Sequence, residues 1–220
     1  MNEKEIIDNI VKEVSKRLGV IKTEEKDKRT TDKKLVPIGI SNRHLHLSEE
    51  HLKYLMSEDY KLEVLRELSQ PGQFASKLTV TLIGSQGFIQ NVRVLGPCRG
   101  RTQVEISKTD SFILGIKPPI RLSGDIAGSC GCIIYVNDKT IKLDEGVIIA
   151  ARHLHLSLLE SEAFGLKNGD IVNARVCGKR GVLFENIVVR AGDGHKMELH
   201  LDTDEANAAD VNNGDLVEII

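Results

Sequence analysis

The sequence has 220 residues, 40% of them apolar and 28% charged, an ordinary composition for a globular protein. Its 30 Lys and Arg residues nearly balance its 32 Asp and Glu residues, so the formal net charge is -2. That balance argues against a general nucleic-acid binder, which needs excess positive charge. No apolar run approaches the roughly 20 residues needed to cross a bilayer, so we expect no membrane span.

The first twenty residues predict an amphipathic helix. Apolar residues recur there with helical spacing and form one stripe. They are Ile6, Ile7, Ile10, Val11, Val14 and Leu18. Residues 22–34 carry no aliphatic or aromatic side chain and cannot repay their ordering entropy, so we predict a flexible linker over residues 21–35. The helix either folds back on the body of the protein or docks on another protein.

Short strands dominate the rest of the chain. Apolar residues that alternate on both sides of a turn predict three β-hairpins, over residues 78–94, 132–143 and 171–189. Short helices are expected after capping residues at 48, 157 and 202 or 203. Many short strands with brief helices favour closed β-barrels over a parallel sheet.

The sequence also contains internal repeats. The hexapeptide Arg-His-Leu-His-Leu-Ser occurs at residues 43–48 and again at residues 152–157. A weaker repeat, Asn-Gly-Asp before two aliphatic residues, begins at positions 168 and 213, where each copy predicts a turn that leads into a strand. Such repetition predicts two duplicated barrel units.

The repeated histidines point to metal chemistry. Side chains alternate along a strand, so His-x-His places both imidazoles on one face and turns the leucines to the core. Strand 197–201 places Glu198 and His200 on one face, and His200 is a candidate third ligand. Imidazole nitrogen suits zinc and similar divalent metals. The alternative is that the histidines are only exposed or hydrogen-bonded. We expect His195, in a turn, to be solvated and His51 to lie on the surface.

A second candidate segment lies between residues 96 and 105. Its Gly-Pro turn presents Arg99 and Arg101 near backbone amides, which indicates either a phosphate site or an ordinary surface turn. Glu105 follows on a strand, as a metal ligand or an ion-pair partner. The four cysteines form no Cys-x-x-Cys pair, and we expect them to be reduced thiols.

Several of these segments, taken in order, carry a resemblance to a known family. They are Ser-Asn-Arg-His-Leu-His-Leu-Ser (41–48), Gly-Pro-Cys-Arg (96–99), Thr-Gln-Val-Glu-Ile-Ser (102–107), Pro-Pro-Ile-Arg-Leu-Ser-Gly-Asp (118–125) and the second hexapeptide. Over about residues 36–220 the sequence resembles the propanediol-utilisation type phosphate propanoyltransferases, or phosphotransacylases. The resemblance implies a mainly β fold of two β-barrels with short capping helices, in which the first strand joins the C-terminal barrel. One barrel would comprise residues 36–42 and 151–220, and the other residues 43–150.

The resemblance implies reversible transfer of a short acyl group, propanoyl or acetyl, between coenzyme A and inorganic phosphate at a two-zinc site. Matched position by position, one zinc site has the ligands His44, His46 and Glu105, and the other has His153, His155 and His200. Arg99 matches the phosphate-binding arginine of the family and is the expected catalytic residue. The positions that contact coenzyme A match Ser41, Arg93 and Asn207. Cys98 stands where we expect a small or aliphatic residue, either as a neutral replacement or as a thiol near the metals.

Family members found in bacterial microcompartments carry a short amphipathic helix on a linker, and residues 1–35 resemble that arrangement. We therefore expect a cytoplasmic location inside a microcompartment for propanediol degradation, shell proteins as partners of residues 1–20, and a homo-oligomer. The sequence leaves two other functions open. One is a metal-dependent hydrolase, and the other is a non-catalytic metal-binding component of the microcompartment.

Overall fold

A computed structural model describes residues 33–220 of the chain. The amphipathic helix predicted over residues 1–20 lies outside the described residues. Strand β1 begins at Lys34, so the last two positions of the predicted linker belong to a strand instead. Between residues 33 and 220, no helix is both long and apolar enough to cross a membrane.

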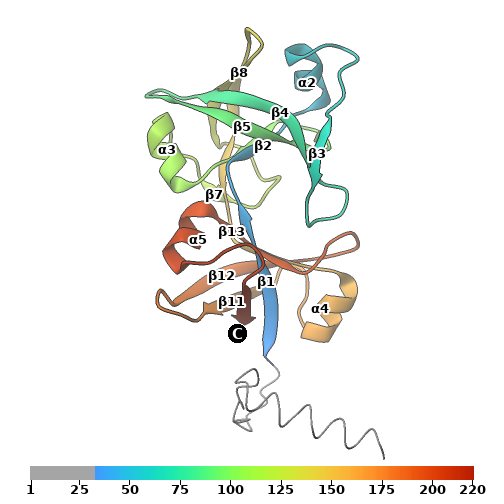
Figure 1. The fold of residues 1–220 in the computed structure, drawn as a ribbon, viewed down its shortest axis with the longest axis vertical. Coiled ribbons are helices and arrows are strands. Elements are labelled where there is room, and N and C mark those ends of the chain that lie inside the picture. Colours follow the sequence, from blue (N-terminus) through green and yellow to red (C-terminus); the bar gives the residue numbers. More distant parts are fainter. Residues whose placement is uncertain (1–32) are drawn as a thin grey trace, which may run out of the picture. The chain divides into compact units, whose positions relative to one another are not determined.

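Six strands close into the C-terminal barrel, in the order β1-β13-β10-β12-β11-β14. These strands are β1 (Lys34–Ser41), β10 (His153–Leu156), β11 (Ile171–Val176), β12 (Val182–Ala191), β13 (Glu198–Asp202) and β14 (Leu216–Ile219). Strand β1 pairs in parallel with β13 and antiparallel with β14, so it is an integral part of this barrel. Figure 1 shows the blue strand β1 among strands drawn in orange and red.

The strands between residues 44 and 150 form the central barrel. Its ring runs β4-β5-β2-β6-β9-β8 and closes where β8 pairs with β4. The ring strands are β2 (His44–His46), β4 (Phe74–Ile83), β5 (Phe88–Gly96), β6 (Gln103–Glu105), β8 (Cys130–Val136) and β9 (Lys139–Ala150). Two more strands, β3 (Val64–Glu67) and β7 (Ile120–Arg121), pair with β4 and β9. The predicted fold of two β-barrels, with the first strand in the C-terminal one, is confirmed.

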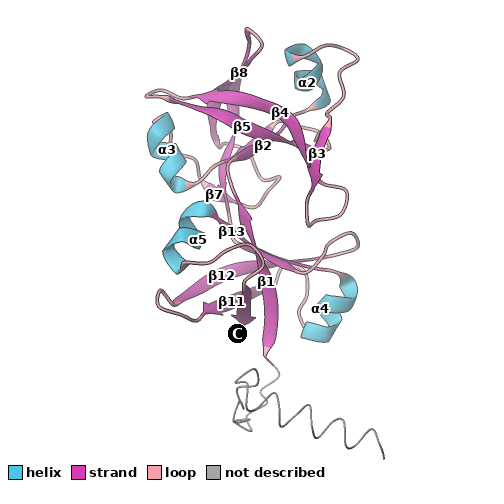
Figure 2. Cartoon of the chain, viewed as in Figure 1, coloured by secondary structure: helices cyan, strands magenta, loops and turns pink. Residues whose placement is uncertain are grey.

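The predicted hairpins are β4 with β5, β8 with β9, and β11 with β12, each an antiparallel pair. The helices are short and lie at the periphery of the strands (Figure 2). They are α2 (Glu49–Leu55), α3 (Lys108–Leu114), α4 (Leu158–Phe164) and α5 (Thr203–Ala209). The predicted caps of α2, α4 and α5 are confirmed at Ser48, Ser157 and Asp202. Helix α3, which we did not predict, begins with a capping box between Ser107 and Asp110.

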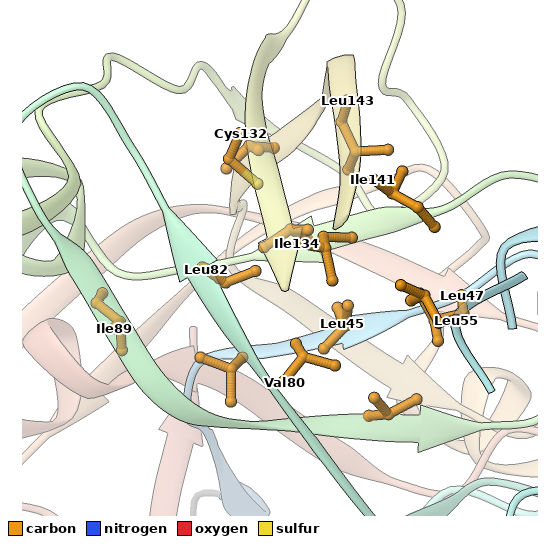
Figure 3. Close-up of a cluster of buried hydrophobic side chains, with 14 of the residues drawn as sticks. Leu45, Leu47, Leu55, Val80, Leu82, Ile89, Cys132, Ile134, Ile141 and Leu143 are labelled. Atoms are coloured by element: carbon orange, nitrogen blue, oxygen red, sulfur yellow. The ribbon is translucent and has the colours of Figure 1, made fainter. Parts of the chain in front are cut away.

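The leucines of the two hexapeptides anchor the two cores. Leu45 and Leu47 are fully buried in the central barrel, and Leu154 and Leu156 are fully buried in the C-terminal barrel. Figure 3 shows Leu45 and Leu47 among the apolar side chains of the central core. Burial of each leucine stabilises the fold by about 1.5–3 kcal/mol. The histidine strands are therefore held in place by the residues between the histidines.

The two barrels repeat the same arrangement of strands around each hexapeptide. Strand β2 pairs in parallel with β5 and antiparallel with β6, and β10 pairs in parallel with β12 and antiparallel with β13. His44 lies opposite Glu105 in the first set, and His153 lies opposite His200 in the second. The duplication predicted from the sequence thus extends to residue pairing.

An arginine before each histidine pair contacts a neighbouring helix. Arg43 pairs with Asp110 through two nitrogens, at 2.8 and 3.0 Å. Arg152 Nε lies 2.8 Å from Glu205 Oε1. Both acids are the third residue of a capping box, so each arginine ties a histidine strand to the start of a helix.

The buried carboxyl of Glu205 should make stability depend on pH. Burial raises the pKa of Glu205 from 4.5 to about 7 in spite of its Arg152 partner. A raised acid pKa means that folding favours the neutral form. This stabilisation is fully present below about pH 4.5 and is lost as the pH rises through about 7. Relative to the wild type, Glu205→Gln should gain about 1–3 kcal/mol in free energy of unfolding between pH 5 and pH 8.

Urea denaturation at both pH values measures this difference. The matched control is Glu185→Gln, because Glu185 is exposed on β12. A constant difference between Glu205→Gln and the wild type across this range would contradict the prediction.

Candidate active site

Residues of both barrels line one cavity of about 720 Å³. The central barrel contributes His44, His46 and Glu105, and the C-terminal barrel contributes His153 and His200. Arg99 lines the same cavity. Histidines of both pairs, which are distant in the sequence, therefore face a common space, although His155 itself is not part of the lining.

Three imidazoles form a compact cluster on the C-terminal barrel. His153 and His155 lie two residues apart on β10, and His200 lies opposite His153 on β13. One ligand nitrogen from each ring lies within 4.8 Å of the other two. The ring centroids are 4.7 to 4.8 Å apart. This spacing allows the three rings to donate to one metal ion.

Burial keeps two of these rings neutral. It lowers the pKa of His153 to about 4, with a smaller contribution from His200, and it lowers the pKa of His155 to about 2. His155 Nδ1 is buried and has no hydrogen-bond partner within residues 33–220. A neutral imidazole with an unused nitrogen is the form that binds a metal. The donor set therefore fits a zinc ion.

The central barrel holds a second set of donors, two imidazoles and a carboxylate. His44 Nε2 lies 3.6 Å from Glu105 Oε2, and the centroids of His44 and His46 are 5.6 Å apart. In the described chain this set is less compact than the three-histidine cluster. Burial lowers the pKa of His46 to about 3, and His46 Nδ1 has no hydrogen-bond partner among the described residues. Burial alone would raise the pKa of Glu105, but His44, Ser123 and Arg99 together hold it at about 2, so Glu105 is a carboxylate.

The first histidine of each pair is fixed by the same backbone contact. His44 Nδ1 lies 2.8 Å from the carbonyl oxygen of Asn42, and His153 Nδ1 lies 2.8 Å from that of Ala151. A carbonyl oxygen only accepts, so Nδ1 carries the proton and Nε2 keeps its lone pair. Metal-binding histidines commonly have this second contact.

A side chain two residues before each third donor contacts that donor. Gln103 Nε2 donates to Glu105 Oε1 over 2.5 Å, and Glu198 Oε2 lies 2.6 Å from His200 Nε2. Gln103 lies opposite His46, and Glu198 lies opposite His155. Gln103 and Glu198 therefore occupy equivalent positions in the two barrels. In the central barrel the amide of Gln103 contacts the carboxylate of Glu105, and in the C-terminal barrel the carboxylate of Glu198 contacts the imidazole of His200. Each pair lies on one strand and one face, as we predicted for Glu198 and His200, but we did not predict either contact.

Residues of both barrels surround the carboxylate of Glu198. Its Oε2 accepts hydrogen bonds from Ser69 and, over 3.4 Å, from Gln70 Nε2. A Cβ added at Gly39 would lie 2.5 Å from Glu198 Cδ, so the absence of a side chain there makes room for the carboxylate. Gly39 lies opposite His200 on β1. These contacts hold Glu198 against the His200 ring.

Arg99 is aimed at the cavity by two contacts. Its backbone N–H donates to Leu47 O over 2.9 Å, and its NH1 donates to Ser123 Oγ over 2.7 Å. Ser123 Oγ also donates to Glu105 Oε1 over 2.8 Å. Burial lowers the pKa of Arg99 from 12.5. The guanidinium is thus linked through one hydroxyl to the carboxylate of the central donor set.

The predicted coenzyme A contacts are only partly brought together. Ser41 on β1 and Arg93 on β5 line the cavity, and Arg93 NH1 donates to the carbonyl oxygens of Ser76 and Lys77. Asn207 is exposed on α5 and does not line the cavity.

Cys98 and His195 both pack against other side chains instead of lying free on the surface. Cys98 packs against the central core, and burial raises the pKa of its thiol, so the chain uses it as a packing residue. His195, which we expected to be solvated, is partly exposed but also contacts the cluster. Its ring centroid lies 4.4 Å from that of His155, and burial lowers its pKa. The turn brings His195 over the cluster, an approach that the local sequence does not reveal.

Known proteins are similar in sequence to this chain over most of its length. Residues 37–212 match the family model for phosphate propanoyltransferase. A phosphate propanoyltransferase from Thermotoga maritima is 50% identical over 184 residues, which cover 83% of this chain and 88% of the relative. Those from Sebaldella termitidis and Clostridioides difficile are 48% and 43% identical over 174 and 197 residues. The first alignment covers 79% of this chain and 82% of the relative, and the second covers 90% and 94%.

The buried amide of Gln103 should be needed for stability as well as for the site. It donates to Glu105 and Ser123 and accepts from the Gly124 N–H over 2.7 Å. Gln103→Leu removes all three bonds and takes this partner from the Gly124 N–H, although Ser123 still bonds Glu105 and Arg99. We expect a loss of about 1–3 kcal/mol in free energy of unfolding, measured by urea denaturation. Gln90→Leu, at an exposed position on β5, is the control and should change the value far less. Equal losses in the two variants would contradict this account.

Proposed function

We propose that this chain, which belongs to the phosphate propanoyltransferase family and is an acyltransferase, moves a propanoyl or acetyl group between coenzyme A and inorganic phosphate at two zinc ions. The observation that carries the proposal is the convergence of two donor sets, five of whose six side chains line one cavity, beside an arginine. Each set contains a buried histidine nitrogen that lacks a partner in the described part of the chain. Buried polar atoms rarely stay unpaired unless they serve a ligand.

In this proposal one zinc is held by His44, His46 and Glu105, and the other by the second donor set, His153, His155 and His200. Bound zinc supplies Lewis acidity, which favours the thiolate of coenzyme A and stabilises negative charge on a carbonyl oxygen. The depressed pKa values of His46, His153 and His155 keep these three rings ready as neutral donors at pH 7.

The reaction exchanges one bond to the acyl carbon for another. In the direction that forms the thioester, the sulfur of coenzyme A attacks the carbonyl carbon of the acyl phosphate. A carbon–sulfur bond forms, the carbon–oxygen bond to phosphate breaks, and the thiol proton goes to solvent. Arg99 binds the phosphoryl oxygens, orients the leaving group and offsets its charge. Transfer is direct, because both substrates are bound together and no acyl-enzyme is needed.

Ser41 and Arg93 contact coenzyme A from the wall of the cavity. Asn207 lies outside that wall, so in this proposal it contacts a part of coenzyme A that extends beyond the cavity. The cavity volume of about 720 Å³ is in the range of ordinary small-molecule sites.

A coupled thioester assay joined to metal analysis tests the proposal. The purified protein should contain two zinc ions per chain, lose transfer after chelation and recover it when zinc is returned. His44→Ala should lose metal and transfer while keeping its unfolding transition. His51→Ala is the control, because His51 lies outside the cavity lining and bonds Thr102.

Loss of acyl phosphate without coenzyme A would identify a metal-dependent hydrolase instead. Bound metal with no turnover of either substrate would identify a non-catalytic metal-binding component. Full transfer by metal-free protein would overturn the two-zinc proposal.

We also propose that residues 1–20 direct the protein into a bacterial microcompartment by binding shell proteins. The support is the apolar stripe in the sequence and its likeness to the helices of microcompartment members of this family. Deletion of residues 1–20 should leave transfer activity intact and abolish co-purification with shells. Ile10→Glu, on the stripe, should act like the deletion, and Lys12→Gln, on the polar face, should not. Insoluble or unfolded protein after the deletion would instead support a helix that folds back on the body.

A further inference from the structure

Arg190 lies beside the three-histidine cluster. It stands on β12, where it is the parallel partner of His155 on β10. Partners in register place their side chains on the same face of a sheet. Arg190 lines the cavity and is half-buried.

The guanidinium of Arg190 has no protein partner among residues 33–220, as neither a side-chain hydrogen bond nor an ion pair involves it. Other half-buried arginines near the site are satisfied. Arg43 and Arg152 pair with carboxylates, and Arg99 donates to Ser123. A partly buried guanidinium without a counter-ion is costly, so its missing partner is an anion that enters the cavity.

Arg190 shares the cavity with the other arginine of the site. Arg99 comes from the central barrel and Arg190 from the C-terminal barrel, and both line the same cavity. The two positive charges repel each other, and this repulsion adds to the effect of burial in lowering the pKa of Arg99. Two guanidinium groups in one cavity suit a dianion with several oxygens, and each can take two of them.

We infer that Arg190 is a second phosphate-binding arginine, which binds the phosphate group of inorganic phosphate or acyl phosphate from the C-terminal barrel while Arg99 binds it from the central barrel. This inference rests on the proposed function and deepens it. Two arginines from two barrels fix the orientation of the phosphoryl group, whereas one leaves it free to turn. The same chemistry would also suit the phosphate groups of coenzyme A, which the experiment separates.

The test is steady-state kinetics of the full chain with phosphate and coenzyme A varied separately in the assays that consume them. Arg190→Gln should raise the KM for phosphate about tenfold to a hundredfold and leave the KM for coenzyme A within about twofold. Arg190→Lys should recover part of the loss, because lysine restores the positive charge but cannot bind two phosphate oxygens side by side as a guanidinium does. Arg175→Gln, at an exposed position on β11, is the control and should match the wild type.

Calorimetric titration of the same variants with inorganic phosphate alone provides a readout that does not depend on turnover. Weaker phosphate binding by Arg190→Gln supports the inference even if the wild type proves not to be a transferase. An unchanged KM and unchanged phosphate binding would overturn it. A rise in the KM for coenzyme A alone would also overturn it, by assigning Arg190 to the phosphates of that substrate. A uniform loss of kcat with a lowered melting temperature would show a merely structural role and overturn it as well.

Discussion

The structure depends on the alternation of side chains along two three- to four-residue strands. Leu45, Leu47, Leu154 and Leu156 are fully buried in the barrel cores, and the histidines between and before them must then face outward. A shift of one residue in either strand would exchange leucines and histidines between core and cavity. The hydrophobic effect therefore sets the position of the polar site, because the energy of burying four leucines far exceeds that of any single polar contact there.

Duplication explains why the cavity has matching halves. Each half has a histidine strand, a third donor on an antiparallel neighbour and an arginine bonded to a capping-box acid. The halves differ where the third donor differs. Gln103 offers an amide to a carboxylate, and Glu198 offers a carboxylate to an imidazole. The neighbouring side chain, Gln103 or Glu198, differs together with the third metal-binding residue that it contacts. Each pair therefore stays complementary in charge and hydrogen bonding.

The sequence allows prediction of the features that depend on local order. Alternation gives the hairpins and the orientation of the histidine strands, and capping residues give three of the four helices between residues 33 and 220. The exact hexapeptide repeat points to duplication, and the resemblance supplies the pairing of distant residues. Contacts that depend on register or on the path of a turn could not be predicted. Ser123 bonds both Gln103 and Glu105 from a segment outside β6, His195 reaches His155 through a turn, and Asn207 is exposed outside the cavity lining.

The halves also differ in where they place charge around the cavity. The central set includes the Glu105 carboxylate as a donor, whereas the C-terminal set has three imidazoles with the Glu198 carboxylate beside His200. On the neighbouring parallel strand, Arg93 lies opposite His44 in the central barrel, and Arg190 lies opposite His155 in the C-terminal barrel. Both arginines line the cavity, so each half contributes one cation from an equivalent strand but at a different position along it. A duplicated site can in this way distribute charge differently in its two halves while it keeps one backbone plan.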